Sequence, residues 1–439
     1  MSTRRDFMKQ SAAGLAGLGL VSAIPSTIYG SKRIAASDKI RIGLIGANGM
    51  GFADLQAFLR NKETECIAIC DVDENVLNRR ASEVEKNFGK RPANLYNDWR
   101  KLIENKDIDL VIIGTPDHWH CLPMVAACEA GKDVYCEKPL GNSIEECRIM
   151  AAAAKKYNRV IQVGQWQRSD PHWQDAVAYL RTGVLGKIRT VRVFSYQGWC
   201  PSIPIKPDGP VPAGVDYNMW LGPAASRPFN VNRFHFTFRW FWDYAGGLMT
   251  DWGVHLLDYA LYGMDVKQPK SIMATGGKFG YPNDACETPD SLQTIYEFND
   301  FTVLWDHAIG INDGAYGRNH GLGFVGENGT LVIDREGWVV IPEIIEGKSR
   351  MQAVPLAKSS GRGLELHVKN HLECMKTRNF NTNASIEIGA ATAKFAHLGN
   401  IAYRTKKKLE WDGTRFTNDE EANRFLIPSY RAPWKLPTV

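Results

Sequence analysis

The chain has 439 residues, enough for two or three domains and a sizeable hydrophobic core. Its composition, 44% hydrophobic and 23% charged, is that of a globular protein and excludes a low-complexity chain. The net charge is +5, and residues 1–39 alone carry +4 of it, so the rest of the chain is nearly neutral and offers no basic face for nucleic acid or an anionic membrane.

The N-terminus begins with an export-like pattern. Arg4 and Arg5 precede a Gly/Ala-rich apolar run over residues 12–24, which is shorter than the roughly 20 residues of a typical membrane span. We therefore predict a twin-arginine-type signal over residues 1–37 and no stable membrane anchor; the alternative is an anchored or disordered N-terminal arm. A functional leader predicts a periplasmic protein, and a non-functional one a cytoplasmic protein.

The nine cysteines are odd in number, lie mostly in apolar runs and show no metal spacing. This pattern predicts buried free thiols, as in a protein that folds in a reducing compartment.

Residues 38–164 alternate between apolar strands and helices. Strands are expected at 39–46, 66–73, 110–116, 133–139 and 159–164, and helices at 51–60, 75–88, 120–131 and 143–157. Strands that are apolar on both faces and alternate with helices predict an α/β fold with a doubly wound parallel sheet.

Residues 165–439 have a different sequence pattern. Alternating, β-branched segments are expected to form strands at 187–198, 271–280, 291–300, 301–310 and 329–341, and helices are expected near 171–182, 247–262, 363–377 and 385–404. The alternation predicts a second, α+β domain whose antiparallel sheet has one covered face.

A glycine loop follows the first expected strand and opens a helix. Gly46 and Gly51 match the first and last glycines of G-x-G-x-x-G, Gly49 keeps the backbone accessible, and Asn48 replaces the middle glycine, a residue that tolerates unusual backbone angles. Asp71 ends the second strand, where a carboxylate binds ribose hydroxyls and repels a 2′-phosphate. The unit predicts NAD rather than NADP; the alternative is a glycine loop with a solvated Asp.

A second polar group, residues 114–120, ends another strand at the edge where such sheets bind ligands. Its two histidines, His118 and His120, have no obvious third metal ligand, so we favour no metal over a metal pair. We predict that one of them contacts the cofactor and the other begins a helix.

Two further groups suggest acid–base chemistry. Lys138, in the Glu137–Pro139 tripeptide at a strand end, would orient a hydroxyl and stabilise oxyanion character; the alternative is a solvated turn. Asp251 and His255 are four residues apart and would share a helix face. His255 suits proton transfer near neutral pH, and Asp251 would position substrate or tune the imidazole. The alternative is an Asp-capped helix with a partly buried histidine.

Tryptophans are concentrated before residue 253, and flat aromatic faces suit sugar rings. We expect two or three of this group in a pocket: Trp166, Trp173, Trp199, Trp220, Trp240, Trp242 and Trp252. The predicted substrate contacts are Trp166, Arg168, His172, Trp199 and Asp251.

Together these motifs resemble the Gfo/Idh/MocA family of NAD(P)-dependent oxidoreductases. The resemblance rests on GLIGANGMG, CDVD, IIGTPDHWH, the EKP element and the Asp251/His255 pair. It implies a Rossmann domain followed by a domain with a large open antiparallel sheet, a dimer or tetramer, and the catalytic set Lys138, Asp251 and His255. The predicted cofactor contacts are Gly46, Asn48, Gly49, Met50, Gly51, Asp71, Thr115, Pro116, His118, Glu137, Lys138 and Gln165.

We therefore predict an oxidoreductase that moves a hydride between tightly bound NAD and a hydroxyl carbon of a sugar, inositol or glycoside. Tight binding would reconcile the leader with the cofactor, because a periplasm holds no free nicotinamide pool. One alternative is a glycosidase that oxidises the sugar's C3 transiently, eliminates the aglycone and returns the hydride. Another is a non-catalytic sugar or nucleotide sensor.

Overall fold

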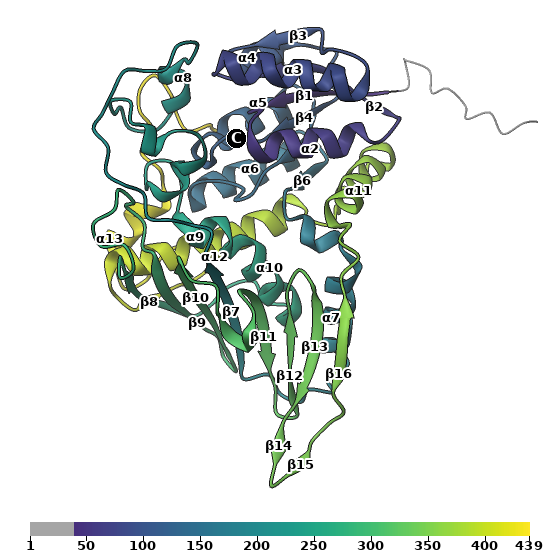
Figure 1. Cartoon of the computed structure of the whole chain (residues 1–439), viewed down its shortest axis with the longest axis vertical. Helices are drawn as coiled ribbons and strands as arrows, with labels where there is room; N and C mark the ends of the chain where they lie inside the picture. The colour runs from purple at the N-terminus through teal and green to yellow at the C-terminus, as the bar shows by residue number, and fades with distance from the viewer. Residues whose placement is uncertain (1–38) are drawn as a thin grey trace, which may run out of the picture. The chain divides into compact units, whose positions relative to one another are not determined.

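A computed structural model describes residues 39–439, so the predicted leader lies outside the described part. The first sheet has six parallel strands in the order β3-β2-β1-β4-β5-β6 (Figure 1). The strands are β1 (Ile40–Ile45), β2 (Thr64–Cys70), β3 (Asn94–Tyr96), β4 (Leu110–Ile113), β5 (Asp133–Cys136) and β6 (Ile161–Val163). All the expected strands are present, and β3 is an additional edge strand.

Helices cover both faces of this sheet. They are α2 (Gly49–Leu59), α3 (Glu74–Phe88), α4 (Trp99–Glu104), α5 (Cys121–Glu129) and α6 (Ile144–Lys156). Strand β4 shows why both faces are covered: Leu110 and Ile112 enter one hydrophobic core, whereas Val111 and Ile113 enter the other. Three of these helices, α3, α4 and α6, begin at side-chain caps, such as Asp73 before α3, whose carboxylate accepts from the N–H groups of Asn75 and Val76.

The second sheet has nine strands, in the order β16-β13-β12-β11-β7-β10-β9-β8-β17. The strands are β7 (Thr190–Gln197), β8 (Ser271–Gly277), β9 (Ser291–Glu297), β10 (Thr302–Ile309), β11 (His320–Val325), β12 (Gly329–Ile333), β13 (Gly337–Pro342), β16 (Val354–Lys358) and β17 (Leu409–Glu410), with a small hairpin of β14 (Ile344–Ile345) and β15 (Lys348–Ser349). The sheet is mixed rather than wholly antiparallel, because β7 and β10 pair in parallel. A parallel pair needs a crossover, and the long segment between these two strands supplies it.

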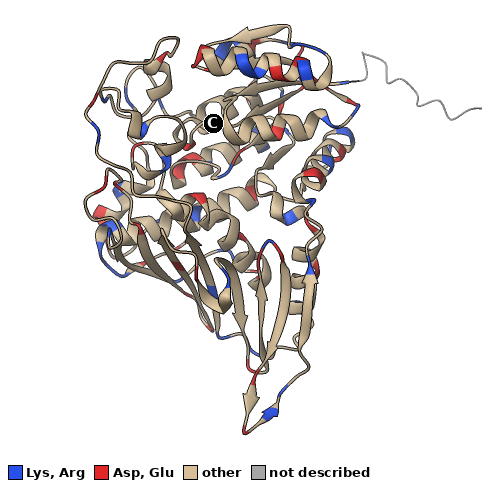
Figure 2. Cartoon of the chain, in the orientation of Figure 1, with Lys and Arg blue, Asp and Glu red and all other residues tan. Residues whose placement is uncertain are grey.

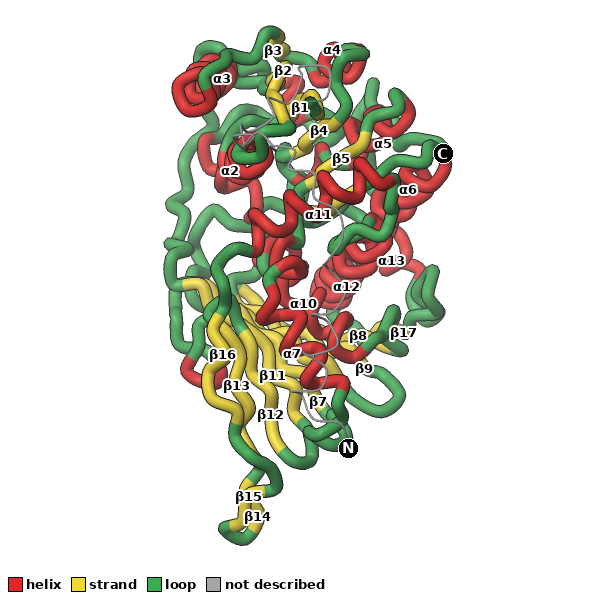
Figure 3. The backbone as a smooth tube through the Cα atoms, turned by 90° about the vertical axis from the view of Figure 1, so that its right-hand side faces the viewer, coloured by secondary structure: helices red, strands yellow, loops and turns green. Residues whose placement is uncertain are grey.

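Three long helices, α7, α10 and α12, pack on one face of the nine-stranded sheet (Figure 3). The helices of this half are α7 (Pro171–Arg181), α8 (Tyr217–Leu221), α9 (Gly247–Asp251), α10 (Gly253–Met264), α11 (Gly363–Thr377), α12 (Ile386–Thr405) and α13 (Glu420–Asn423). The single helix expected over 247–262 is interrupted at Trp252, although the backbone there keeps helical angles (φ −86°, ψ −31°).

The two halves share their cores. From α11, Val368 and Leu372 enter the core on one face of the parallel sheet, and Ile386 and Ala393 of α12 enter the core on its other face. The division between residues 164 and 165 therefore separates the sheets but not the hydrophobic packing.

Charges and thiols are distributed as in an ordinary globular interior and surface. Lys and Arg are interspersed with Asp and Glu over the described residues (Figure 2). All nine cysteines are free thiols, and eight of them are buried. Within residues 39–439, no helix has the length and apolar character that crossing a bilayer requires.

Candidate active site

The turn from β1 into α2 is built from glycine backbone. Gly46 has φ +81° and Gly49 has φ +54°, a left-handed region that favours glycine. Asn48, in contrast, is extended (φ −95°, ψ 161°). The fingerprint therefore does not need a middle residue that tolerates unusual angles, which was the reason we had expected Asn48 to be accepted there.

The outer glycines let three backbone segments touch. A Cβ on Gly51 would lie 2.3 Å from the carbonyl oxygen of Gly46, and a Cβ on Gly114 would lie 2.4 Å from Cα of Gly51. A Cβ on Gly49 would meet nothing within 4 Å. The loop is thus closed towards β4 and open on its other side, where the first N–H groups of α2 favour a phosphate.

Asp71 lies just beyond β2 and lines the same pocket. Its Oδ2 accepts from the N–H of Ala47 (2.8 Å) and its Oδ1 from the N–H of Asp73 (3.0 Å). Burial raises the pKa of this carboxyl, and the two N–H donors oppose that shift. His235 is also in the lining and contacts Asp73 through Nε2 (3.0 Å). These groups form a polar end suited to ribose hydroxyls.

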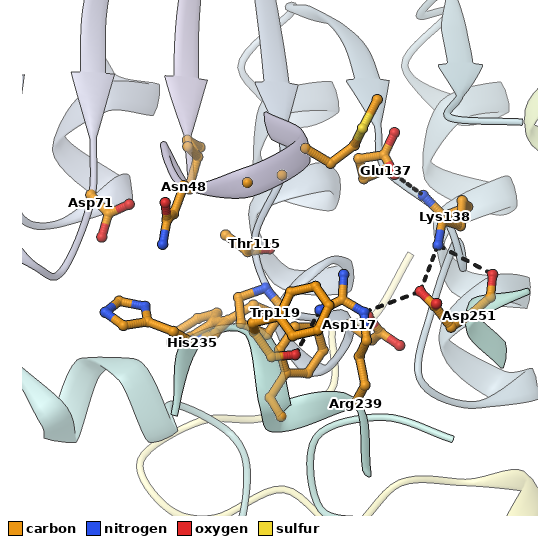
Figure 4. Close-up of a pocket in the computed structure, with 18 of the residues that line it drawn as sticks. Asn48, Asp71, Thr115, Asp117, Trp119, Glu137, Lys138, His235, Arg239 and Asp251 are labelled. Atoms are coloured by element: carbon orange, nitrogen blue, oxygen red, sulfur yellow. Dashed lines mark hydrogen bonds and ion pairs between the residues drawn. The ribbon is translucent and has the colours of Figure 1, made fainter. Parts of the chain in front are cut away.

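A cavity of about 690 Å³ extends from the glycine loop to Lys138 and His255. Figure 4 shows Asn48 and Asp71 at one end and Lys138 and Asp251 at the other. The buried hydroxyl of Thr115, in the lining between them, has no hydrogen-bond partner among the described residues. The glycine cradle, the acid at the end of β2 and this unpaired hydroxyl fit an extended dinucleotide.

The catalytic end contains a three-membered ion cluster. Lys138, just after β5, donates from Nζ to Oδ1 of Asp251 (2.8 Å) and to its carbonyl oxygen (3.2 Å), and Nε of Arg239 contacts the same Oδ1 at 3.2 Å (Figure 4). Burial alone would raise the pKa of Asp251, but the two cations lower it below its usual range. Asp251 is therefore a carboxylate that fixes Lys138, whose third N–H remains for a ligand.

His255 lines the same end of the cavity with an unencumbered imidazole. Neither ring nitrogen has a hydrogen-bond partner within residues 39–439, and Nδ1 is fully buried. Burial, with help from Lys138 and Arg335, lowers the pKa of His255 well below its ordinary value. The imidazole is neutral at physiological pH and is ready to accept a proton.

Two buried acids adjoin this cluster. Burial raises the pKa of Glu137 to about 7 and that of Asp117 to about 7, with Lys138 opposing both shifts. Behind Glu137 lies Asp54 of α2, fully buried, whose pKa is raised by burial and by the neighbouring Glu137 carboxyl. Lys138 and Arg239 thus face acids that are only partly ionised near neutral pH.

The two histidines after β4 contact backbone carbonyl oxygens and so support the structure around the site. His120 contacts the carbonyl oxygens of Pro139 (2.7 Å) and Thr115 (2.9 Å) through its two ring nitrogens, which ties the two strand ends together. His118 contacts the carbonyl oxygen of Trp220 at 3.1 Å and does not line the cavity, so the structure gives no cofactor contact for it. No cluster of metal-ligating side chains occurs within residues 39–439.

Most of the predicted contacts line the cavity, and their binding roles stay predictions. The lining includes Gly46, Asn48, Gly49, Met50, Asp71, Thr115, Pro116, Glu137, Lys138, Trp166, Asp251 and His255. Three of the seven grouped tryptophans are present: Trp166, Trp220 and Trp252.

Several predicted residues lie outside this lining and interact with other parts of the protein. Arg168 pairs with Asp258 (2.6 Å), and His172 contacts Asp170 (3.0 Å) and is buried. Gln165 is buried against α10, and the space beside Gly51 is filled by the backbone of Gly46 and Gly114. Trp199 is exposed, although its ring packs at 5.9 Å against Phe236 of the lining.

The sequence did not predict some of the residues that line the cavity. Arg335, Trp119, His235, Phe236 and Phe238 line the cavity. Trp119 lies in the 114–120 group but was not among the predicted contacts. The other four come from segments without a motif, and only the high aromatic content near residue 236 hinted at a contribution. Arg239, which contacts Asp251, comes from the same aromatic segment and was not among the predicted contacts either.

The strand order, the glycine turn and the acid after β2 define a dinucleotide-binding Rossmann domain, here joined to a second α/β domain. Family models agree: "Oxidoreductase family, NAD-binding Rossmann fold" matches residues 40–165, and "Oxidoreductase family, C-terminal alpha/beta domain" matches residues 190–436. The chain belongs to the Gfo/Idh/MocA family of oxidoreductases, and its cofactor is NAD.

Individual relatives match over shorter stretches. A levoglucosan dehydrogenase from Pseudarthrobacter phenanthrenivorans is 34% identical over 164 residues, which are 36% of this chain and 42% of that protein. A "Glycosyl hydrolase family 109 protein" from Shewanella baltica is 34% identical over 170 residues, 35% of this chain and 37% of that protein. The chain thus matches only about two fifths of the length of these curated relatives.

Solved structures share the fold over most of the chain. A levoglucosan dehydrogenase in complex with NADH and levoglucosan superposes with a TM-score of 0.63 at 21% identity, covering 85% of this chain and 99% of the other. An aldose-aldose oxidoreductase from Caulobacter crescentus complexed with glycerol gives 0.62 at 20% identity, covering 85% and 100%.

Proposed function

We propose that this protein is an NAD-dependent oxidoreductase that acts on a hydroxyl or keto carbon of a sugar, polyol or glycoside. The observation that carries the proposal is the position of the unpaired, neutral imidazole of His255 beside the Lys138–Asp251 pair, in the cavity that begins at the glycine loop. Bound NAD supplies a hydride acceptor or donor at its nicotinamide ring.

Each residue of the catalytic end has a separate task. His255 takes the proton of the reacting hydroxyl in oxidation and returns it in reduction, because its lowered pKa keeps the imidazole neutral. Lys138 donates its remaining N–H to the same oxygen and stabilises developing negative charge there. Asp251 orients Lys138 and compensates its charge. Aromatic walls, including Trp166 and Trp252, suit the C–H faces of a sugar and exclude water.

The test is the absorbance of reduced nicotinamide in the purified protein before and after adding a panel of sugars, polyols and glycosides. We expect nucleotide to co-purify or load, and one sugar class to produce the reduced band. If the protein binds nucleotide, but no sugar reduces that nucleotide and no glycoside releases its aglycone, the result would instead support the sensor alternative.

A second candidate is glycoside cleavage through transient oxidation. The specific observation in its favour is the 34% identity to a glycosyl hydrolase family 109 protein over 170 residues. It predicts release of aglycone from an aryl glycoside without net formation of NADH, whereas the dehydrogenase proposal predicts stoichiometric NADH.

We also propose that the protein is exported folded with its NAD and works as a homo-oligomer in the periplasm. The support is the Arg4-Arg5 pattern before an apolar run, together with nine free thiols, which suit folding in a reducing compartment. Cell fractionation of the full chain and of an Arg4→Lys, Arg5→Lys double variant tests the export. Light scattering of the purified protein tests for a dimer or tetramer.

A further inference from the structure

Arg335 lines the catalytic end of the cavity and has no acidic partner. It lies in the turn between β12 and β13 and is half-buried. Its Nε and Nη2 both donate to Oε1 of Gln167, at 3.1 and 3.0 Å. Within residues 39–439 no carboxylate pairs with its guanidinium, and Nη1 has no hydrogen-bond partner. Arg239 and Lys138, the other cations of the lining, both contact Asp251.

Two indole rings hold the guanidinium in place. Its carbon lies 4.9 Å from the ring centre of Trp166 and 4.4 Å from that of Trp252. The same rings flank the imidazole of His255, at 6.4 and 6.2 Å. The cation is therefore fixed beside the proposed base, in the part of the cavity where a substrate would lie.

No acid compensates the charge of Arg335 directly. Lys138 and Arg239 contact the ionised carboxylate of Asp251 and adjoin the partly ionised acids Glu137 and Asp117. Arg335 pairs with no carboxylate among residues 39–439, and the neighbouring His255 is neutral. Burial lowers the pKa of Arg335 to about 10, and only Asp251 opposes that shift. A buried cation without a counter-ion is costly, and stacking on indoles compensates it only in part.

We propose that Arg335 binds an anionic group on the substrate, so that the substrate is an acidic sugar carrying a carboxylate or a sulfate or phosphate ester. This inference rests on the proposed sugar oxidoreductase function. Nε and one N–H of Nη2 are directed at Gln167. The N–H groups of Nη1 and the second N–H of Nη2 remain, and this planar fork matches the two oxygens of such a group. Trp166 and Trp252 keep it from turning away.

The test compares neutral sugars with counterparts that carry an anionic group at C6. The NAD-loaded protein is titrated with glucose against glucuronate, galactose against galacturonate, and glucose against glucose 6-phosphate and glucose 6-sulfate. Binding is read from quenching of tryptophan fluorescence, since two indoles touch the guanidinium, and turnover is read from NADH. We expect at least one acidic member to bind about tenfold or more tighter than its neutral partner. The pairs separate a carboxylate from an ester as the anion.

Variants assign the preference to Arg335. Arg335→Gln should abolish the preference for the acidic member, Arg335→Lys should retain part of it, and Arg350→Gln, which removes an exposed charge in the β14–β15 hairpin segment, should leave it unchanged. Neutral sugars that bind as well as every acidic partner in the wild type overturn the inference, as does an equal loss for both members in Arg335→Gln. Binding of NADH and reduction by a neutral sugar are recorded separately, so the proposed function can survive that outcome.

Discussion

The two ends of the cavity are built in opposite ways. At the nucleotide end, backbone does most of the work: Gly46 and Gly51 allow close contact with β4, and the carboxylate of Asp71 binds the N–H groups of Ala47 and Asp73. At the catalytic end, side chains do the work, and Lys138 and Asp251 meet from positions 113 residues apart.

This difference determines which substitutions each end of the cavity tolerates. Backbone recognition depends on the absence of a side chain and on a few nearby residues, so it accepts Asn48 in place of glycine. The charge cluster depends on mutual compensation in a buried place, where removing one member leaves another unpaired. The following predictions probe the two ends separately, from the largest expected effect to the smallest.

Replacing His255 with Asn should lower kcat by about 10² to 10⁴, because the only unpaired imidazole lining the cavity in the described chain would be lost. NADH affinity should not change, because the glycine loop is untouched. Initial rates with the sugar found in the absorbance screen and a fluorescence titration with NADH measure the two quantities. Normal turnover by this variant would remove His255 from its assigned role.

Asp251→Asn should destabilise the fold by about 3 kcal/mol, because Lys138 and Arg239 would lose their common carboxylate in a largely buried place. Denaturant unfolding measures the change. Asp300→Asn is the matched control, because Asp300 is exposed and its ion pair with Lys187 is long, at 3.9 Å, and lies at the surface. Equal stability of the two variants would show that the cluster is not a stabilising unit.

Gly51→Ala and Gly49→Ala form a matched pair at the nucleotide end. The added Cβ at position 51 overlaps backbone at 2.3 Å, and we expect a loss of about 1–3 kcal/mol of stability with weaker NADH binding. At position 49 the space is open and only the positive φ opposes the change, at about 1 kcal/mol. Thermal unfolding and NADH titration measure the two effects. A larger loss in Gly49→Ala than in Gly51→Ala would contradict this view of the loop.

Asp71→Ser should narrow the preference for NAD over NADP by about tenfold, because the carboxylate that repels a 2′-phosphate is removed. The ratio of the two dissociation constants is the measurement, and Asp73→Ser controls for the loss of charge nearby. An unchanged ratio would place the selectivity elsewhere in the ribose end.

The contribution of His255 to the pH dependence should be small near neutrality. His255 acts as a base only when neutral, and its pKa lies well below 6.5, so kcat/KM should be insensitive to this group above about pH 6.5 and fall only at more acidic pH. Arg335→Gln removes one of the cations that lower this pKa, so the acidic limb should move upward towards neutral pH. A limb centred near 6.5 in the wild type would contradict a buried, neutral imidazole.

Much of the fold follows from local pattern. The expected strands of the parallel sheet are present because their apolar runs can be buried only between two layers of helices, as β4 shows. The prediction was less complete in the second half. The parallel pairing of β7 with β10 and the break at Trp252 depend on long-range contacts that alternation and helical spacing do not encode.

The sequence by itself determined the glycine loop, the acid after β2, the lysine after β5 and the Asp251/His255 spacing, because each depends on residues close together in the chain. Only the tertiary structure decided which charges compensate one another. It paired Lys138 with Asp251, engaged Arg168 and His172 away from the cavity, and placed Arg335 between two indoles beside His255. Electrostatic compensation depends on distance and burial, and both are properties of the folded chain.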